Sequence, residues 1–273
     1  MTPIIYPPQS YEFSLVLFTV FSQLAAGVSC FIAYRTVKNG PAPDCRVLLD
    51  RLLYRRDWLL VLVTVGLGMF ASLFHLGHPY RAPLAISNLS TSWLSREILI
   101  FSVFSVLALL NVLAGKSSKQ LALFTAAVGV LGVLAQGFTY APASMPALGN
   151  GAPLILFAVT ALAAGSAFAG LVEPKADYTR PLLVGLALFV AAFLAFPALW
   201  SAGETVVKET GQAWFASAYY WPALVCAVLA GLLLKSKPLL PFASLLVLVS
   251  ALAGRLVFFG STLHTAAYIG QLY

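Results

Sequence analysis

Long apolar runs alternate with short polar stretches along the whole chain. Eight of these runs are each roughly 18 to 25 residues long, which is enough for a helix to cross the hydrocarbon core of a bilayer. They cover residues 12–34, 57–75, 92–114, 119–140, 153–172, 180–200, 215–234 and 238–263. Backbone groups in lipid must be hydrogen-bonded within the protein, so the runs are expected to be helices; a barrel would show short alternating segments instead. The pattern predicts an all-α integral membrane protein with eight transmembrane helices.

The composition supports this class of protein. Hydrophobic residues make up 60% of the chain and charged residues only 9%, and a soluble protein could not bury that much apolar surface. No connection between the runs is long enough to fold by itself. Residues 1–273 are therefore expected to form a single polytopic membrane domain.

The basic residues lie mostly on one side of the predicted membrane. Twelve of the 16 Lys and Arg residues fall in or beside the connections that follow the first, third, fifth and seventh runs. Short cytoplasmic connections carry an excess of Lys and Arg, so both termini are expected on the extracytoplasmic side, which requires an even number of spans. Orientation signals thus account for the net charge of +7, and no nucleic-acid partner is expected.

The segment between the second and third predicted helices holds the residues best suited to chemistry. His75 ends the second helix, and Glu97 lies near the start of the third. Because these helices are antiparallel neighbours, the two side chains are expected to meet at one depth, where they can accept protons from a substrate and pass them to water. Two other interpretations stay open: an acid favoured by the helix dipole, and a histidine bonded to a carbonyl group at the interface. Membrane-buried carboxylates are usually functional, which favours the proton-accepting pair over these two alternatives.

The connections on the predicted outer side carry two further candidates. Arg81 follows the turn at Gly77 and Pro79, and it is suited either to bind a carbonyl oxygen or a partner's carboxylate, or to be a solvated loop residue. The connection 141–152 has no charged residue. It is equally compatible with a docking surface and with an ordinary turn in the membrane interface.

Two residues inside the predicted spans require a polar neighbour. Arg255 lies within the eighth span, where an arginine needs a partner or must extend to the interface, and Glu97 is a candidate partner. Pro197 lies near the end of the sixth span and lacks a backbone N–H. It is expected to bend the helix and to free a carbonyl group that a neighbouring side chain can satisfy.

The cysteine and histidine positions argue against a metal or redox centre within the chain. The cysteines are Cys30, Cys45 and Cys226. They form no C-x-x-C pair, so neither a disulfide framework nor an iron–sulfur site is expected. The histidines are His75, His78 and His264. No two of them lie inside spans, which argues against a transmembrane haem, and their scatter makes a poor zinc site.

The polar hairpin also resembles a known family. The segments His75-Leu-Gly-x-Pro-x-Arg81-Ala and Ser92-Trp-Leu-Ser-x-Glu97-Ile are similar to the membrane anchor subunit of the dimethyl sulfoxide reductase family. Phe18-Thr-Val-Phe-x-Gln23 in the first span, and Gly254-Arg255 with Phe259-Gly260 in the eighth, resemble the same family. The resemblance covers the whole chain, and the hairpin is its specific part.

The resemblance implies a role in anaerobic respiration at the cytoplasmic (inner) membrane. Such an anchor holds a molybdopterin catalytic subunit and an iron–sulfur subunit on the membrane. It binds menaquinol, oxidises it, and passes the electrons to the iron–sulfur subunit, which is expected to dock on the extracytoplasmic face. No haem, iron–sulfur cluster or molybdenum is then expected in this chain, which is a quinol-oxidising subunit and does not itself reduce the terminal acceptor.

The resemblance also assigns residues. It ties His75 and Glu97 to the quinol as proton acceptors, with Arg81 and Arg255 as supporting quinol-binding residues. Some relatives carry an acid four residues before the helix-eight arginine, where this chain has Ala251. No carboxylate role is therefore expected in the eighth helix.

Two other functions are compatible with a polytopic chain. A secondary transporter would usually show polar or broken helices near the bilayer midplane, often in repeated halves. Here the ionisable residues within spans lie toward one face, and no repeat is visible. A purely structural anchor without a quinol site predicts that His75 and Glu97 are dispensable.

Overall fold

The computed structural model describes residues 12–38, 48–76, 78–114, 118–172, 177–234 and 237–268. Within these ranges every regular element is helical. The α-helices are α1 (Phe13–Lys38), α2 (Leu48–Leu73), α3 (Trp93–Ala114), α4 (Lys119–Thr139), α5 (Ala152–Val172), α6 (Thr179–Ser201), α7 (Thr205–Ala216), α8 (Tyr220–Leu233) and α9 (Leu240–Ser261). Three short 3₁₀ helices are η1 (Pro79–Ile86), η2 (Lys237–Leu239) and η3 (Thr265–Tyr268). The all-α class predicted from the sequence is confirmed.

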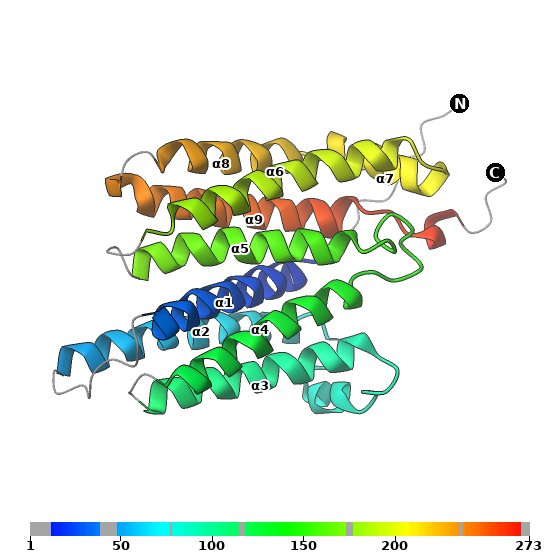
Figure 1. Cartoon of the computed structure of the whole chain (residues 1–273). Helices are drawn as coiled ribbons and strands as arrows, with labels where there is room; N and C mark the ends of the chain where they lie inside the picture. The colour runs from blue at the N-terminus through cyan, green and yellow to red at the C-terminus, as the bar shows by residue number, and fades with distance from the viewer. Residues whose placement is uncertain are drawn as a thin grey trace.

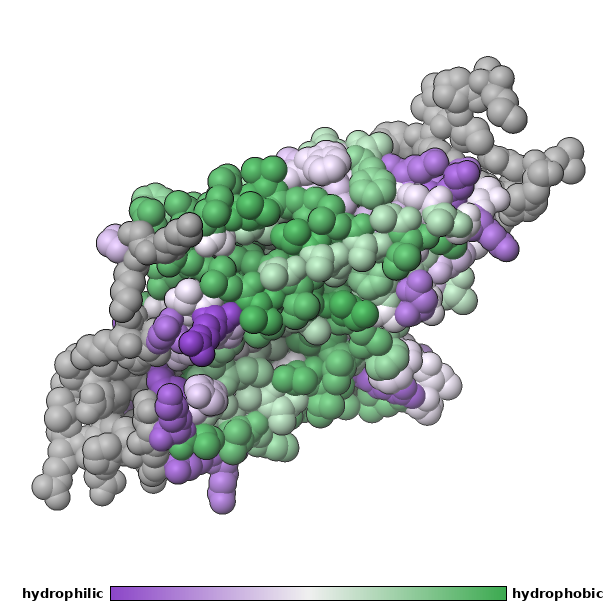
Figure 2. Space-filling model, turned by 45° about the horizontal axis from the view of Figure 1, so that its top comes forward, coloured by the Kyte–Doolittle hydropathy of each residue, from purple (hydrophilic) through white to green (hydrophobic). Residues whose placement is uncertain are grey.

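Seven helices in the described part of the chain are long and apolar enough to cross a membrane. They match seven of the eight predicted runs, although α2 begins at Leu48 rather than at residue 57. Figure 2 shows hydrophobic residues covering the middle of one face of the bundle, with hydrophilic residues toward its two ends. This distribution is typical of a multi-pass membrane protein.

The remaining predicted run differs from the structure. A continuous helix over 215–234 was expected after a loop over 201–214, but the chain forms α7 and then α8, with a bend of 60° between them. The residues 205–216 include Lys208 and Glu209, so they lack an apolar run although they are helical. The α8 helix alone has 14 residues, fewer than the roughly 20 that span a bilayer. The pair forms one broken span or a re-entrant segment, and the total of eight stays a prediction.

The first helix lies at the centre of the bundle. It packs against α2 and α4 on one side and against α5 and α9 on the other (Figure 1). The contact with α5 depends on glycine: a Cβ added at Gly27 would lie 2.1 Å from the carbonyl oxygen of Ala161 and 2.8 Å from Cα of Gly165. Small residues at such crossings let helices in a membrane approach closely, where dispersion contacts hold them together.

The carbonyl group freed by Pro197 has the neighbour that the sequence led us to expect. Pro197 cannot donate to the carbonyl of Phe193, one helical turn earlier. The hydroxyl group of Tyr220 at the start of α8 donates to that carbonyl oxygen at 2.7 Å. The prediction of a satisfying neighbour is confirmed, and the bond fixes the bent α7–α8 segment against α6.

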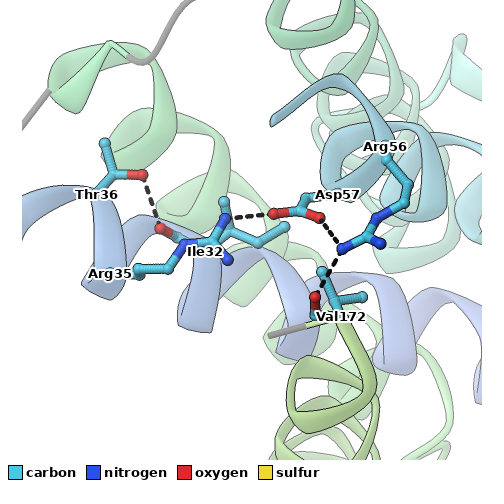
Figure 3. A network of polar contacts seen from close by, with 6 residues as sticks. All are labelled: Ile32, Arg35, Thr36, Arg56, Asp57 and Val172. Carbon is cyan, nitrogen blue, oxygen red and sulfur yellow. Dashed lines mark hydrogen bonds and ion pairs between the residues drawn. The ribbon is translucent and has the colours of Figure 1, made fainter. Parts of the chain in front are cut away.

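A buried ion-pair cluster joins α1, α2 and α5 at the end of the bundle where α1 finishes. Asp57 in α2 is 2% exposed, and it pairs with Arg35 of α1 and with Arg56 (Figure 3). Arg56 also donates to the carbonyl oxygen of Val172, at the end of α5, at 2.7 Å. Buried charges need this kind of pairing, and the cluster joins the ends of α1 and α5 to a point inside α2.

Candidate functional site

An apolar cavity of about 490 Å³ lies at the opposite end of α1, between α1, α2, η1, α3 and the end of α4. Its polar lining residues are Ser72, His75, Ser102, Thr139 and Tyr140. Its apolar lining residues are Leu15, Phe18, Met69, Leu73, Leu76, Ala82, Pro83, Ala85, Ile86, Leu94 and Ile98. A cavity of this size, mostly apolar with a few polar groups, is typical of a small-molecule site.

His75 reaches the cavity from the turn that ends α2. Its backbone N–H donates to the carbonyl oxygen of Ser72, three residues earlier, at 3.2 Å. This bond forms a turn directly after α2. The Nδ1 atom of His75 lies 2.7 Å from Oε2 of Glu12. The carboxyl group that contacts His75 is therefore Glu12 at the start of α1, and the predicted direct pairing with Glu97 is wrong.

Glu97 is fully buried in α3, one turn inside the helix. Among the described residues, neither oxygen of its carboxyl group has a hydrogen-bond partner. Its polar neighbours are Thr139 and Gln136 of α4. The Thr139 hydroxyl donates to the carbonyl oxygen of Ala135, whereas Gln136 gives only one of its two amide hydrogens to Ser22. Leaving a buried carboxyl group without a donor costs free energy, and carboxyl groups buried within membrane spans are usually functional.

The position of Glu97 argues against a simple capping role. The first turn of α3 contains no acidic residue, and Ser92 supplies its hydroxyl oxygen to the N–H of Ser95 at 3.3 Å. Glu97 is not among the lining residues of the cavity, but Ile98 and Thr139 beside it are. His75 and Glu97 thus lie near the same cavity without touching each other.

Arg255 is 1% exposed in α9 and has neutral partners in the described structure. One terminal nitrogen donates to Oε1 of Gln23 at 2.7 Å and to the hydroxyl group of Thr160 at 3.1 Å. Its guanidinium carbon lies 4.0 Å from the ring centre of Phe157, in a cation–π contact. Gln23 is the side chain that meets Arg255, so the suggested direct pairing with Glu97 is wrong.

A chain of side-chain amides nevertheless connects Arg255 with the neighbourhood of Glu97. Gln23, which accepts from Arg255, donates through Nε2 to Oε1 of Gln136 at 2.6 Å. Gln136 donates in turn to the hydroxyl group of Ser22 at 3.0 Å. Because Gln136 also neighbours Glu97, the buried cation and the buried carboxyl group lie at the two ends of one polar network across α9, α1, α4 and α3.

Four residues of this region were given no role from the sequence: Glu12, Gln23, Gln136 and Tyr140. The two glutamines carried a usable signal, because an uncharged polar side chain in an apolar span usually faces the protein interior. Glu12 had no such signal, since an acid at a membrane surface is ordinary. Tyr140 lines the cavity, and its ring packs edge-on against Phe259 at 5.2 Å between centroids.

The structure shows fewer contacts for the remaining residues named from the sequence, Arg81, His78 and His264. Arg81 lies in η1, next to Ala82, which lines the cavity, but its side chain lies outside the described part of the structure. The ring of His78 packs on Tyr80 at 5.6 Å between centroids. His264 follows α9, at the same end of the bundle as η3.

Comparison with known families decides what this bundle belongs to. The family described as DMSO reductase anchor subunit (DmsC) matches residues 9–261. The chain belongs to this family. The matched range includes every residue of the cavity and the amide network, so the resemblance noted on the hairpin and on the first and last spans is confirmed.

Three curated relatives of the DmsC family are similar to this chain. Anaerobic dimethyl sulfoxide reductase chain YnfH of Escherichia coli is 28% identical over 178 residues, covering 62% of this chain and 60% of the relative. A chain of the anaerobic dimethyl sulfoxide reductase of Haemophilus influenzae is 28% identical over 162 residues, covering 57% and 56%. A chain of the anaerobic dimethyl sulfoxide reductase of E. coli is 32% identical over 94 residues, covering 34% and 31%. The aligned region thus spans at most about three fifths of the relatives' lengths.

The side chains that most often bind metal ions are scattered in the described part of the chain. Those ranges hold no group of three or more His, Cys, Asp or Glu side chains that could bind a metal ion. Cys30 and Cys226 are free thiols, and Cys45 lies outside the described residues.

Proposed function

We propose that this chain is the membrane anchor of a dimethyl sulfoxide reductase-type complex and that it oxidises menaquinol in the cavity beside His75. The observation that carries the proposal is the coincidence of three features at one end of the bundle. An apolar cavity has an imidazole in its wall, and a fully buried carboxyl group without a donor lies behind the wall. Each feature suits one part of a quinol.

The apolar lining suits the ring system of a naphthoquinol and the start of its isoprenoid tail. The cavity volume of about 490 Å³ is within the range of pockets that hold small ligands, roughly 300 to 1,000 Å³. Three of the polar lining residues lie at helix ends: Thr139 is the last residue of α4, Tyr140 follows it, and His75 follows α2. These groups can orient the two quinol oxygens.

Oxidation of a quinol releases two protons and two electrons, and the chain supplies groups for the protons. His75 can accept one, because a neutral imidazole nitrogen is a general base and the side chain is 42% exposed, so the proton can pass on to water. Glu97 can accept the other from the Thr139 side of the cavity. Before that transfer, the positive charge of Arg255 at the other end of the amide chain offsets the negative charge of an ionised Glu97.

The electrons leave for a partner. We infer an iron–sulfur subunit docked at the cavity end of the bundle, and a molybdopterin catalytic subunit beyond it, with this end on the extracytoplasmic side. The uncharged connection after α4 lies at this end, directly after the lining residue Tyr140. Ala147 and Leu148 within this connection are fully buried. The backbone N–H of Thr265 donates to the carbonyl oxygen of Ser144 at 2.9 Å. These contacts hold the connection in one conformation, which a partner subunit can bind.

Filling the cavity separates this proposal from a structural anchor. Ile98 lines the cavity and is partly buried, so Ile98→Trp should exclude the quinol ring. We expect the KM for a menaquinol analogue to rise at least about tenfold, the effect of losing roughly 1.4 kcal/mol of binding. Reduction of the terminal acceptor with a dye as electron donor should be unchanged in the purified complex.

The matched control is Val106→Trp on the same helix. Val106 is 57% exposed on the outside of the bundle, so the same side chain there should leave the KM unchanged. Equal quinol kinetics in the two variants would show that the cavity does not bind the quinol. Family membership makes a secondary transporter unnecessary as an explanation.

A further inference from the structure

The contact between Glu12 and His75 assigns a specific role to Glu12. We propose that Glu12 is a positioning residue that holds the proton of neutral His75 on Nδ1, so that Nε2 faces the ligand as the proton acceptor. This inference rests on the proposed function. The inference adds Glu12 to the proposed site, and the effect of Glu12 on the histidine can be measured without quinol.

Both partners are held by helix ends. The carbonyl oxygen of Glu12 accepts the N–H of Val16 at 2.9 Å, so Glu12 is fixed at the start of α1. The helices themselves lie close together, because a Cβ added at Gly68 of α2 would be 3.2 Å from the carbonyl oxygen of Phe18. The distance of 2.7 Å between Glu12 Oε2 and His75 Nδ1 therefore follows from the packing of α1 on α2.

Hydrogen-bond chemistry then determines the tautomer. An ionised carboxylate can only accept hydrogen bonds, and a neutral imidazole has one N–H group and one lone pair. A short contact between Oε2 and Nδ1 requires the hydrogen on Nδ1. The lone pair must then be on Nε2, the ring nitrogen left for a ligand in the cavity that His75 lines. Carboxylates orient histidines in this way in many sites.

The proton transfer is balanced with this arrangement. The O–H bond of the quinol hydroxyl group breaks, and an N–H bond forms at Nε2 of His75. The resulting imidazolium keeps its Nδ1–H bond to Glu12, which becomes a charge-assisted hydrogen bond. The electrons pass to the iron–sulfur partner inferred above.

A role in stability is a weaker explanation for the pair. The side chains of His75 and Glu12 are 42% and 39% exposed, and ion pairs in that setting contribute little to folding. One hydrogen bond between Glu12 and Nδ1 is enough to favour one tautomer, and partial exposure does not remove that bond.

The first test observes the tautomer directly. The full chain labelled with ¹⁵N-histidine, carrying His78→Gln and His264→Gln, shows only His75 in long-range ¹⁵N–¹H spectra at a pH where the ring is neutral. We expect the Nδ1–H form with Glu12 present and with Glu12→Asp, and a loss of that preference in Glu12→Ala. The same tautomer in the Glu12→Ala chain, or the Nε2–H form with Glu12 present, would overturn the proposal.

The second test uses the whole complex. Glu12→Gln should lower kcat for quinol oxidation about tenfold, the lower end of what the partner of an oriented histidine contributes, while the KM stays within a factor of two. Glu12→Asp should restore most of the rate. Glu204→Gln, which removes an exposed acid at the start of α7, should have no effect.

The two proposals fail in different ways. If quinol oxidation proceeds normally in both His75→Ala and Glu12→Gln, the quinol site itself is wrongly placed. If His75→Ala abolishes oxidation but Glu12→Gln keeps the kcat of the unaltered complex, only the role of Glu12 is wrong.

Discussion

Replacement of His75 by alanine should abolish quinol-dependent reduction of the terminal acceptor. Without the imidazole, the cavity loses a proton-accepting side chain from its wall, and general bases typically contribute about 10²- to 10⁴-fold to a rate. We therefore expect kcat/KM for a menaquinol analogue to fall at least about 100-fold. The measurement compares quinol-driven with dye-driven reduction in the same purified complex, and the dye-driven rate should be retained because it bypasses this chain.

Two further variants, one test and one control, are measured beside His75→Ala. Glu97→Gln keeps the shape of the buried side chain but cannot take up a proton, so it should also lose quinol-driven turnover. His78→Ala is the control, because His78 packs on Tyr80 outside the cavity lining and should retain full turnover. If His75→Ala and Glu97→Gln both oxidise quinol at the rate of the His78→Ala control, the chain is a structural anchor without a quinol site.

Gly27→Ala should cause the largest loss of folded protein of any single methyl addition in α1. The new Cβ would lie 2.1 Å from the carbonyl oxygen of Ala161 and 2.8 Å from Cα of Gly165. Both are backbone atoms, so neither can rotate away, and α1 must separate from α5. Overpacking usually costs 1 to 3 kcal/mol, and at this distance we expect about 3 kcal/mol or more, measured as the change in unfolding free energy in detergent.

Gly66→Ala is the matched control in a neighbouring helix. A Cβ added at Gly66 meets no atom within 4 Å, and alanine favours the helix, so stability should be unchanged or slightly raised. If Gly27→Ala and Gly66→Ala unfold alike, α1 and α5 do not cross as closely as described.

The spans could be predicted because hydropathy reports them directly. Seven runs became helices, since a long apolar segment in lipid pairs its backbone groups best as a helix. Six of them lie near their predicted ends, and α2 begins earlier, at Leu48. The exception is the region of α7 and α8. Lys208 and Glu209 interrupt its apolar pattern, and hydropathy cannot distinguish a charged helix at a membrane surface from a charged loop. The contact of Tyr220 with Phe193, which holds the start of α8 against α6, joins residues 27 positions apart, and no local pattern indicates it.

The site could be predicted only in part. The hairpin indicated that His75 and Glu97 lie at one end of the bundle, and the structure places both near one cavity. The hydrogen-bond partners of these side chains could not be predicted, because they depend on how each helix is rotated about its own axis. Glu12 is 63 residues from His75 in the chain, and Gln23 is 232 residues from Arg255. Only the packing of α1 at the centre of the bundle brings these pairs together.

Photolabelling tests the quinol site most directly. A menaquinone analogue with an azide on its ring, activated by light in the purified complex, should attach to this chain within residues 69–86, 94–102 or 139–140, which contain most of the cavity lining. Labelling should disappear in Ile98→Trp and persist in Val106→Trp. Attachment within α8 or α9, undiminished by Ile98→Trp, would contradict the account, because it would place the quinol away from His75 and Glu97.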